Sequence, residues 1–225
     1  EKFWSEYWDF GEIIGDKGSQ IISKDKIFHR NKFFKDSKLN FAENLLSKNN
    51  DEIAIHSLKE NGEHENISWE QLNINVKKLS SFFKFFDLKK GDRIAGYVPN
   101  TIETIVSFLA TSKNGLIWSS CSPDFGIQGV IDRFKQIEPK ILVTCDQYNY
   151  NGKKIDILNR IPAILEAIPS IKKVIVFNYD KNESSNHEYE NFYKILETSN
   201  LNEEFEKFEF NHPVYILYSS GTTGV

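Results

Sequence analysis

The segment with the clearest chemical character is the small, hydroxyl-rich sequence SSGTTG at residues 219–224. It follows an apolar run that begins at Pro213 and is typical of a buried strand. In a glycine-rich turn, several backbone N–H groups can point at one anion, and Ser and Thr hydroxyls add small donors. Gly221 and Gly224 permit positive φ and close approach of a ligand. The pattern therefore predicts a phosphate-binding loop, and a flexible polar turn is the alternative.

Other catalytic patterns are absent from the sequence. No Gly-Lys-Ser/Thr follows the glycines, so the segment is not a Walker A loop. No Gly-x-Ser-x-Gly occurs, which disfavours an α/β-hydrolase. The histidines have no metal-ligand spacing, and we predict no metal site made of protein side chains; they are His29, His56, His64, His187 and His212. For His212, which precedes a proline, we expect a structural role in a turn.

The elements that must position this loop alternate between strand and helix. Strands are predicted at 52–58, 93–98, 116–122, 140–145, 172–179 and from 213. Helices are predicted at 69–86, 100–115, 124–139, 153–168 and 190–199. A further short aromatic helix is expected near residues 3–11. The predicted fold class is α/β, a mostly parallel doubly wound sheet flanked by helices, with ligands at the carboxyl ends of the strands.

Local signals mark where several of these helices begin and end. Asn40 with Glu43, and Ser68 with Gln71, have the spacing of capping boxes. Asn100 with Glu103 predicts a third cap. Gly115 is expected to end that helix, and Pro162 to kink or restart another; both positions are typical of such boundaries.

Composition limits the partners and the compartment. The net charge is −4 and only four residues are Arg, so a nucleic-acid groove is disfavoured. Two cysteines, Cys121 and Cys145, are too few for a disulfide scaffold, and we expect buried free thiols in a reducing cytoplasm. No signal peptide and no apolar window of about 20 residues is seen, so we expect a soluble protein without a membrane partner. Because the sequence contains no Met, we expect that it is not an intact translation product.

Several segments resemble the adenylate-forming enzymes, the superfamily of acyl-CoA synthetases, luciferases and peptide-synthetase adenylation domains. SSGTTG resembles their phosphate loop, and KKGDRIAGYVPN (89–100) and ISWEQL (67–72) resemble two other shared segments. Within the superfamily, four stretches are similar to the acetoacetyl-CoA synthetases: 3–18, LNFAENLL (39–46), WSSCSPDFG (118–126) and 139–153. The chain is therefore identified as the N-terminal portion of such an enzyme.

The resemblance implies a fold and an activity. Residues 1–50 would form an N-terminal extension and 51–225 a partial α/β domain. The whole protein would be an ATP-dependent acetoacetate–CoA ligase that uses ATP, Mg²⁺ and CoA and releases AMP and pyrophosphate. The alternatives are a ligase for acetate, propionate or butyrate, or an inactive nucleotide-binding fragment. We expect the isolated chain to be inactive, and the sequence indicates no oligomeric state.

The resemblance also assigns site residues. The ATP phosphates would be held by Ser219, Ser220, Gly221, Thr222, Thr223 and Gly224, with Thr222 and Thr223 as the main hydroxyl contacts. For CoA, Lys153 falls on a basic position that contacts a phosphate, and Tyr150 stands where related enzymes have Arg. The loop 122–126 would line the pantetheine path, and Asp124 could also cap the next helix. The catalytic residues are expected beyond residue 225.

Overall fold

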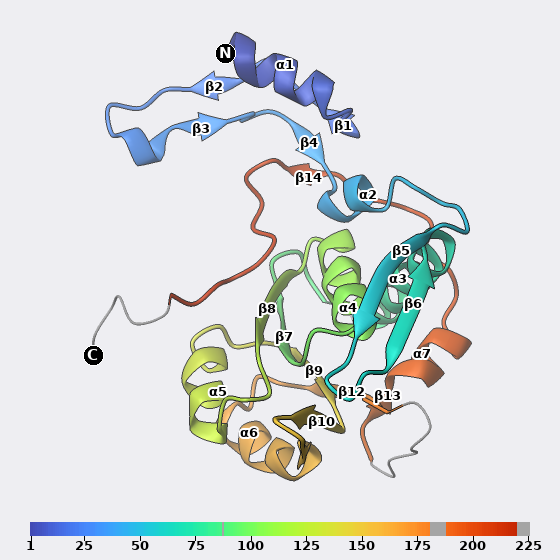
Figure 1. Cartoon of the computed structure of the whole chain (residues 1–225). Helices are drawn as coiled ribbons and strands as arrows, with labels where there is room; N and C mark the ends of the chain where they lie inside the picture. The colour runs from blue at the N-terminus through green and yellow to red at the C-terminus, as the bar shows by residue number, and fades with distance from the viewer. Residues whose placement is uncertain (87, 181–187, 220–225) are drawn as a thin grey trace.

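A parallel five-stranded sheet forms the centre of the fold (Figure 1). The computed structural model describes residues 1–86, 88–180 and 188–219. The strands, in spatial order, are β13 (Glu190–Asn191), β12 (Lys173–Phe177), β9 (Ile141–Cys145), β7 (Arg93–Tyr97) and β8 (Ile117–Cys121). All neighbouring pairs are parallel, and every residue of β9 is buried. The predicted parallel α/β class is confirmed.

Helices cover both faces of this sheet. One group comprises α3 (Trp69–Phe85), α4 (Ile102–Lys113) and α7 (Phe192–Thr198), in which α3 contacts both others. The other comprises α5 (Ile127–Phe134) and α6 (Ile161–Ala167), which contact each other on the opposite side in Figure 1. The chain moves outward from β7 to β8 and then back past β7 to β9. With right-handed crossovers, that reversal places α4 and α5 on opposite faces.

Two of the three predicted helix caps are confirmed. At α2 (Phe41–Leu45), Asn40 Oδ1 accepts the Glu43 N–H at 3.2 Å. At α3, Ser68 Oγ accepts the Gln71 N–H at 3.2 Å.

The third cap, Asn100 at α4, is wrong. Thr101 is the N-cap, and it makes no side-chain capping bond. Glu103 is instead buried and accepts a hydrogen bond from the Tyr193 hydroxyl on α7 at 2.9 Å, so a contact between helices takes the place of the local cap. Gly115 follows the end of α4 with φ +65°, in agreement with the predicted stop.

The predicted helix at 153–168 is wrong over its first half, because the α-helix α6 begins only at Ile161. Residues 147–156 form an antiparallel hairpin of β10 (Gln147–Tyr150) and β11 (Lys153–Asp156). Its turn is Asn151 and Gly152, with φ of 50° and 69°, and two consecutive positive φ values are typical of a two-residue type I′ turn. The 3₁₀ turn η2 (Leu158–Arg160) leads into α6, which carries Pro162 in its first turn.

The N-terminal segment packs beside this layered body. It comprises α1 (Lys2–Phe10), β1 (Gly15–Asp16), β2 (Ile22–Ser23), η1 (Phe28–Arg30), β3 (Lys32–Phe33) and β4 (Lys38–Leu39). The expected aromatic helix is present, and Trp8 of α1 packs on Phe34 with ring centroids 5.0 Å apart. The distant strand β14 (Phe208–Glu209) pairs with β4 and β4 with β1, whereas β5 (Ile53–Leu58) pairs with β6 (His64–Ser68). The domain boundary near residue 50 stays a prediction.

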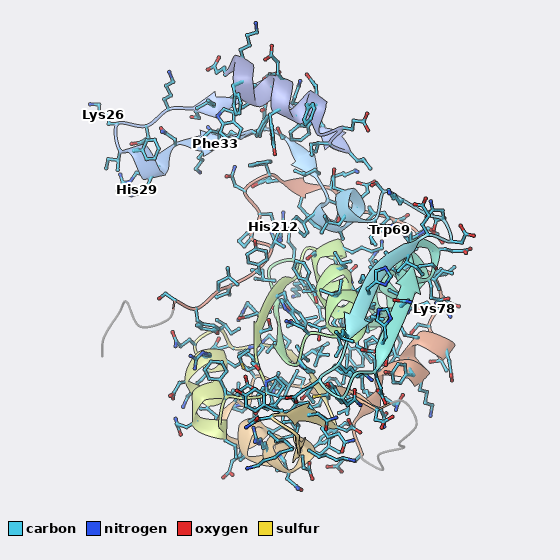
Figure 2. The ribbon with its side chains drawn as sticks, in the orientation of Figure 1. Lys26, His29, Phe33, Trp69, Lys78 and His212 are labelled. Carbon is cyan, nitrogen blue, oxygen red and sulfur yellow. The ribbon has the colours of Figure 1, made fainter. Side chains whose placement is uncertain are left out.

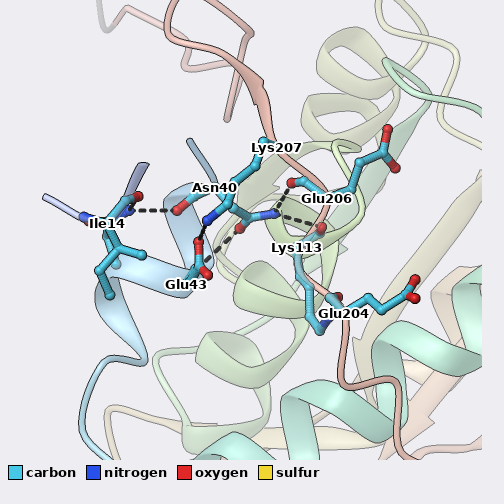
Figure 3. A network of polar contacts seen from close by, with 8 residues as sticks. Ile14, Asn40, Glu43, Lys113, Glu204, Glu206 and Lys207 are labelled. Carbon is cyan, nitrogen blue, oxygen red and sulfur yellow. Dashed lines mark hydrogen bonds and ion pairs between the residues drawn. The ribbon is translucent and has the colours of Figure 1, made fainter. Parts of the chain in front are cut away.

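One buried carboxamide joins three segments that are far apart in the sequence (Figure 3). Asn40 has no exposed surface, and its Nδ2 donates to the Lys113 carbonyl at 2.9 Å and to the Glu206 carbonyl at 2.8 Å. Its Oδ1 caps α2, so both ends of the amide have partners. Beside it, the Lys207 ammonium pairs with the Glu43 carboxylate. Asn40 therefore links α2, the end of α4 and the segment that leads to β14.

Lys113, next to this contact, is a buried lysine. Lys113 is 1% exposed, and its ammonium donates to the Glu204 carbonyl. The ammonium nitrogen also lies 4.0 Å from the centroid of the Phe205 ring. Burial lowers the pKa of Lys113 to about 8, and the charges of Lys84 and Lys77 act in the same direction. No described carboxylate forms an ion pair with the Lys113 ammonium, and the charges of Glu203 and Glu204 oppose only part of the effect of burial on its pKa.

The lowered pKa predicts a pH dependence of stability. Between about pH 8 and the ordinary lysine pKa, the unfolded chain holds a proton at Lys113 that the folded chain has released, so folding is favoured as pH rises. Relative to Lys113→Met, the wild type should therefore gain about 2 kcal/mol of unfolding free energy from pH 7.5 to pH 10. Urea unfolding at several pH values measures this gain. Lys78→Met on α3 (Figure 2) is the control and should parallel the wild type; parallel curves for Lys113→Met would contradict the prediction.

Candidate functional site

The segment that leads into SSGTTG lies along the edge of the sheet beside β8. The backbone N–H of Trp118 donates to the Val214 carbonyl at 3.0 Å, and the Trp118 carbonyl accepts the backbone N–H of Ile216 at 2.8 Å. The Ser119 hydroxyl donates to the Ile216 carbonyl at 2.9 Å. In the described part of the predicted last strand, up to residue 219, pairing with β8 is limited to one isolated parallel bridge, between Trp118 and Tyr215. Because the segment runs parallel to β8, Ser219 lies toward the carboxyl edge of the sheet.

Only the first residue of the predicted phosphate loop is described. Ser219 is exposed, directly after this anchored stretch. Ser220, Gly221, Thr222, Thr223 and Gly224 lie outside the described residues, so their contacts with ATP phosphates stay a prediction. Ser219 lies at the edge where open α/β sheets bind ligands, beyond the carboxyl ends of their strands.

The loop 122–126, which follows β8 at the same edge, is held by side chains from β7 and η2. The Tyr97 hydroxyl, at the end of β7, lies 3.0 Å from the Pro123 carbonyl and 2.7 Å from the Phe125 carbonyl. Arg160 of η2 donates to the Tyr97 hydroxyl and, at 3.0 Å, to the Pro123 carbonyl. Burial raises the pKa of Tyr97, whereas the Arg160 charge opposes the rise. Tyr97 therefore stays a neutral hydroxyl that can donate to the loop.

Asp124 in this loop does not cap α5, contrary to the alternative considered from the sequence. The N-cap of α5 is Gly126, without a side-chain bond. The Asp124 carboxylate instead accepts a hydrogen bond from the Tyr148 hydroxyl of β10. Burial and this acceptor raise the pKa of Tyr148, so the phenol keeps its proton. The contact with a different strand thus replaces the local cap.

The two residues predicted to contact CoA lie side by side on the exposed hairpin. Tyr150 and Lys153 are register partners at the ends of β10 and β11, and paired residues share one face of a two-stranded sheet. Tyr150 is 54% exposed, and Lys153 is also exposed. The Asn151 N–H in the turn donates to the Glu60 carboxylate at 2.6 Å, which ties the hairpin tip to the β5–β6 turn. Their contact with CoA stays a prediction.

Asp146 is a buried residue at this edge that the sequence reasoning missed. It follows β9, and its Oδ1 accepts the N–H groups of Gln147 at 2.7 Å and Tyr179 at 2.9 Å. Its backbone N–H donates to the Phe177 carbonyl at 3.0 Å, and its carbonyl accepts the Ile157 N–H at 2.9 Å. Asp146 thus joins the ends of β9 and β12 to the hairpin. An acidic residue directly after a buried strand was the available signal.

The described histidines and cysteines do not form a single cluster. Across the described ranges, no three His, Cys, Asp or Glu side chains gather where they could hold a metal ion. Figure 2 shows His29 at the far end of the N-terminal hairpin and His212 on the segment that leads to 219. His212 Nε2 lies 2.8 Å from the Gly115 carbonyl, in agreement with a structural role. Cys121 and Cys145 are free and buried, and burial raises the pKa of Cys121 to about 12.

Comparison with known proteins places this geometry in a family. Residues 41–225 match the model of a family described as AMP-binding enzyme. The chain belongs to the AMP-binding enzyme family. The match confirms the predicted superfamily. In the described part of this AMP-binding chain, no helix has both the length and the apolar character needed to cross a membrane.

Similar members of the AMP-binding family include two acetoacetyl-CoA synthetases. The protein of Xenopus tropicalis is 40% identical and that of Rhizobium meliloti 37% identical, each over 99% of this chain and 35% of the relative. A malonamoyl-CoA synthetase of Penicillium aethiopicum, vrtB, is 34% identical over 99% of this chain and 33% of its own length. The chain thus spans about a third of the length of these relatives.

A solved structure has the same fold. The acetoacetyl-CoA synthetase from Streptomyces lividans superposes with a TM-score of 0.90 at 29% identity, over 99% of this chain and 34% of that protein. This similarity confirms the fold class as a partial domain of an adenylate-forming enzyme, as the sequence predicted.

Proposed function

We propose that the whole protein is an ATP-dependent acid–thiol ligase that forms acetoacetyl-CoA from acetoacetate and CoA. The observation that carries this proposal is the similarity to acetoacetyl-CoA synthetases, 34–40% identical over 99% of the chain, within the AMP-binding family. We further propose a cytoplasmic location, in which both thiols would stay reduced.

The proposed reaction has two steps. A carboxylate oxygen of acetoacetate attacks the α-phosphorus of ATP, the bond to the β-phosphate breaks, and pyrophosphate leaves. The sulfur of CoA then attacks the acyl carbon of the adenylate, AMP leaves, and the thiol proton is released. Charge on the phosphate oxygens changes in the first step, so backbone N–H groups and hydroxyls of residues 219–224 would stabilise its transition state. Mg²⁺ would enter as part of the ATP complex and help to neutralise the phosphates.

The carboxyl edge of the sheet supports this assignment of roles. Ser219 directly follows the anchored edge segment, and the loop 122–126, which would line the site, is fixed by Tyr97 and Arg160. Lys153 would place its ammonium on a phosphate of CoA, with Tyr150 as its neighbour on the hairpin. A fixed loop keeps a bound substrate in a reactive geometry, which lowers the entropy cost of reaction.

A second acid is favoured by one specific relative. Malonamate has the carbon and oxygen skeleton of acetoacetate with an amide nitrogen in place of the terminal methyl, and a malonamoyl-CoA synthetase is 34% identical over 99% of this chain. A pocket for either acid would have nearly the same shape. Polarity at the terminal position would then decide between methyl and amide, because an unpaired buried amide is costly.

The test is pyrophosphate exchange and thioester formation by the whole protein with acetoacetate, malonamate, acetate, propionate and butyrate. The highest kcat/KM is expected for acetoacetate. A higher value for malonamate would support the second candidate, and a clear preference for acetate would contradict both. No exchange with any of these acids would support the inactive nucleotide-binding alternative.

A further inference from the structure

Arg133, in the last turn of α5, contacts two segments of the site at once. Its guanidinium carbon lies 4.1 Å from the centroid of the Phe125 ring and 5.8 Å from that of the Tyr218 ring. Phe125 belongs to the loop 122–126, whereas Tyr218 directly precedes Ser219. A guanidinium over an aromatic face is attracted to the ring electrons, and both distances lie within the range of this attraction.

The charge of Arg133 has no acidic partner in the described part of the chain. Its Nη1 donates to the Gly129 carbonyl within α5 at 2.8 Å, and no described carboxylate forms an ion pair with it. Asp132, its neighbour, accepts instead from the Gln128 amide at 2.7 Å. The two aromatic rings are therefore the main partners of the free face of the guanidinium, which lies beside the segment that leads into 219–224.

Each of the two segments is also held separately. The Tyr218 hydroxyl donates to the Arg133 carbonyl at 2.8 Å, and the backbone two residues earlier is bound to β8. The loop 122–126 is bound through the carbonyls of Pro123 and Phe125 to Tyr97. Tyr218 is thus attached to α5 by a hydrogen bond as well as by ring contact, while Phe125 reaches α5 through its ring. Loss of the guanidinium would remove the ring contacts of Arg133 with both segments, whereas the hydrogen bonds that hold each segment separately would remain.

We propose that Arg133 is a positioning residue that holds the loop 122–126 and the entry to residues 219–224 in one arrangement, so that the nucleotide and thiol parts of the site form together. The inference rests on the proposed function for its kinetic consequences, but the coupling of the two segments is a property of the fold. It follows that disturbance of Arg133 should affect both segments, whereas disturbance of Phe125 alone should release only its own loop.

The first test is hydrogen–deuterium exchange on the whole protein, which requires no activity. In Arg133→Met, which keeps the length and apolar stem, peptides covering 122–126 and 216–219 should both exchange about tenfold faster than in the wild type. Arg30→Met, at an exposed arginine of the N-terminal segment, should change neither. Faster exchange in only one of the two segments, or in neither, would overturn the proposal. This readout stands even where the proposed ligase activity fails.

The second test separates positioning from general stability. In Arg133→Met, KM for ATP and KM for CoA should each rise about tenfold, with KM for the acid unchanged. Arg133→Lys keeps the charge and should recover part of both losses, and circular dichroism should show equal folded fractions. Unchanged KM values with only a lower thermal midpoint would mean that Arg133 serves the stability of α5 alone, and the proposal would be wrong.

Discussion

Replacing Thr222 and Thr223 together by alanine is expected to lower kcat/KM for ATP in acetoacetate-dependent pyrophosphate exchange by about 10³-fold. Hydroxyl donors aimed at phosphate oxygens act mainly in the transition state, and loss of one such donor costs about 10²-fold to 10³-fold in rate. The loss should fall on kcat more than on KM, because charge builds up after ATP has bound. Steady-state exchange with the whole protein at varied ATP measures both constants.

The matched control is Thr198→Ala. Thr198 ends α7, and its hydroxyl donates to the Lys194 carbonyl within that helix. The Thr198→Ala variant loses a threonine hydroxyl of the same kind, but at a site remote from the carboxyl edge of the sheet. Its rate of pyrophosphate exchange should therefore equal that of the wild type. A loss of less than about threefold in the double variant would show that residues 219–224 make no transition-state contact through hydroxyls. In that case the proposed phosphate loop would have to act through its backbone alone.

Replacing Asn40 by alanine is expected to lower the unfolding free energy by about 3 kcal/mol. The change removes a helix cap, worth about 1 kcal/mol, and leaves the carbonyls of Lys113 and Glu206 without this donor, at about 1 kcal/mol each. Because Asn40 has no exposed surface, water cannot readily replace its amide. Urea unfolding with a fixed slope measures the loss.

Asn191→Ala isolates the capping part of that loss. Asn191 caps α7 by accepting the Lys194 N–H at 3.0 Å, the same local contact that Asn40 makes with α2. The Asn191→Ala variant should lower the unfolding free energy by about 1 kcal/mol. Equal losses for the two variants would contradict the role of Asn40 as the link between α2, α4 and the segment before β14. A larger loss for Asn40 would measure that link directly.

Sequence signals that act over a few residues predicted their structures well. The caps at Asn40 and Ser68 and the stop at Gly115 were readable because capping geometry depends only on neighbouring positions. The hairpin at 147–156 was missed although Asn151-Gly152 is a strong turn signal. The lysines and apolar residues that follow, with Pro162 near, have a pattern that also fits one helix.

Competition from distant groups explains the wrong caps. Glu103 had the spacing of a capping partner, but its carboxylate accepts from Tyr193, which is 90 residues away in the sequence. Asp124 could have capped α5, yet it accepts from Tyr148 on β10. A polar side chain that becomes buried forms a hydrogen bond with whichever group the fold brings near it, and spacing along the sequence does not identify that group.

By itself, the sequence determined the class of fold and the alternation of the main strands and helices, and it predicts a phosphate loop at 219–224. These follow from apolar periodicity and from residue types that favour turns and caps, which are local properties. Only the tertiary structure decided that Tyr97 and Arg160 hold the loop 122–126, that Asp146 joins two strand ends, and that Arg133 contacts both Phe125 and Tyr218. The physical reason is that each of these contacts depends on the parallel sheet bringing the carboxyl ends of separate strands to one edge.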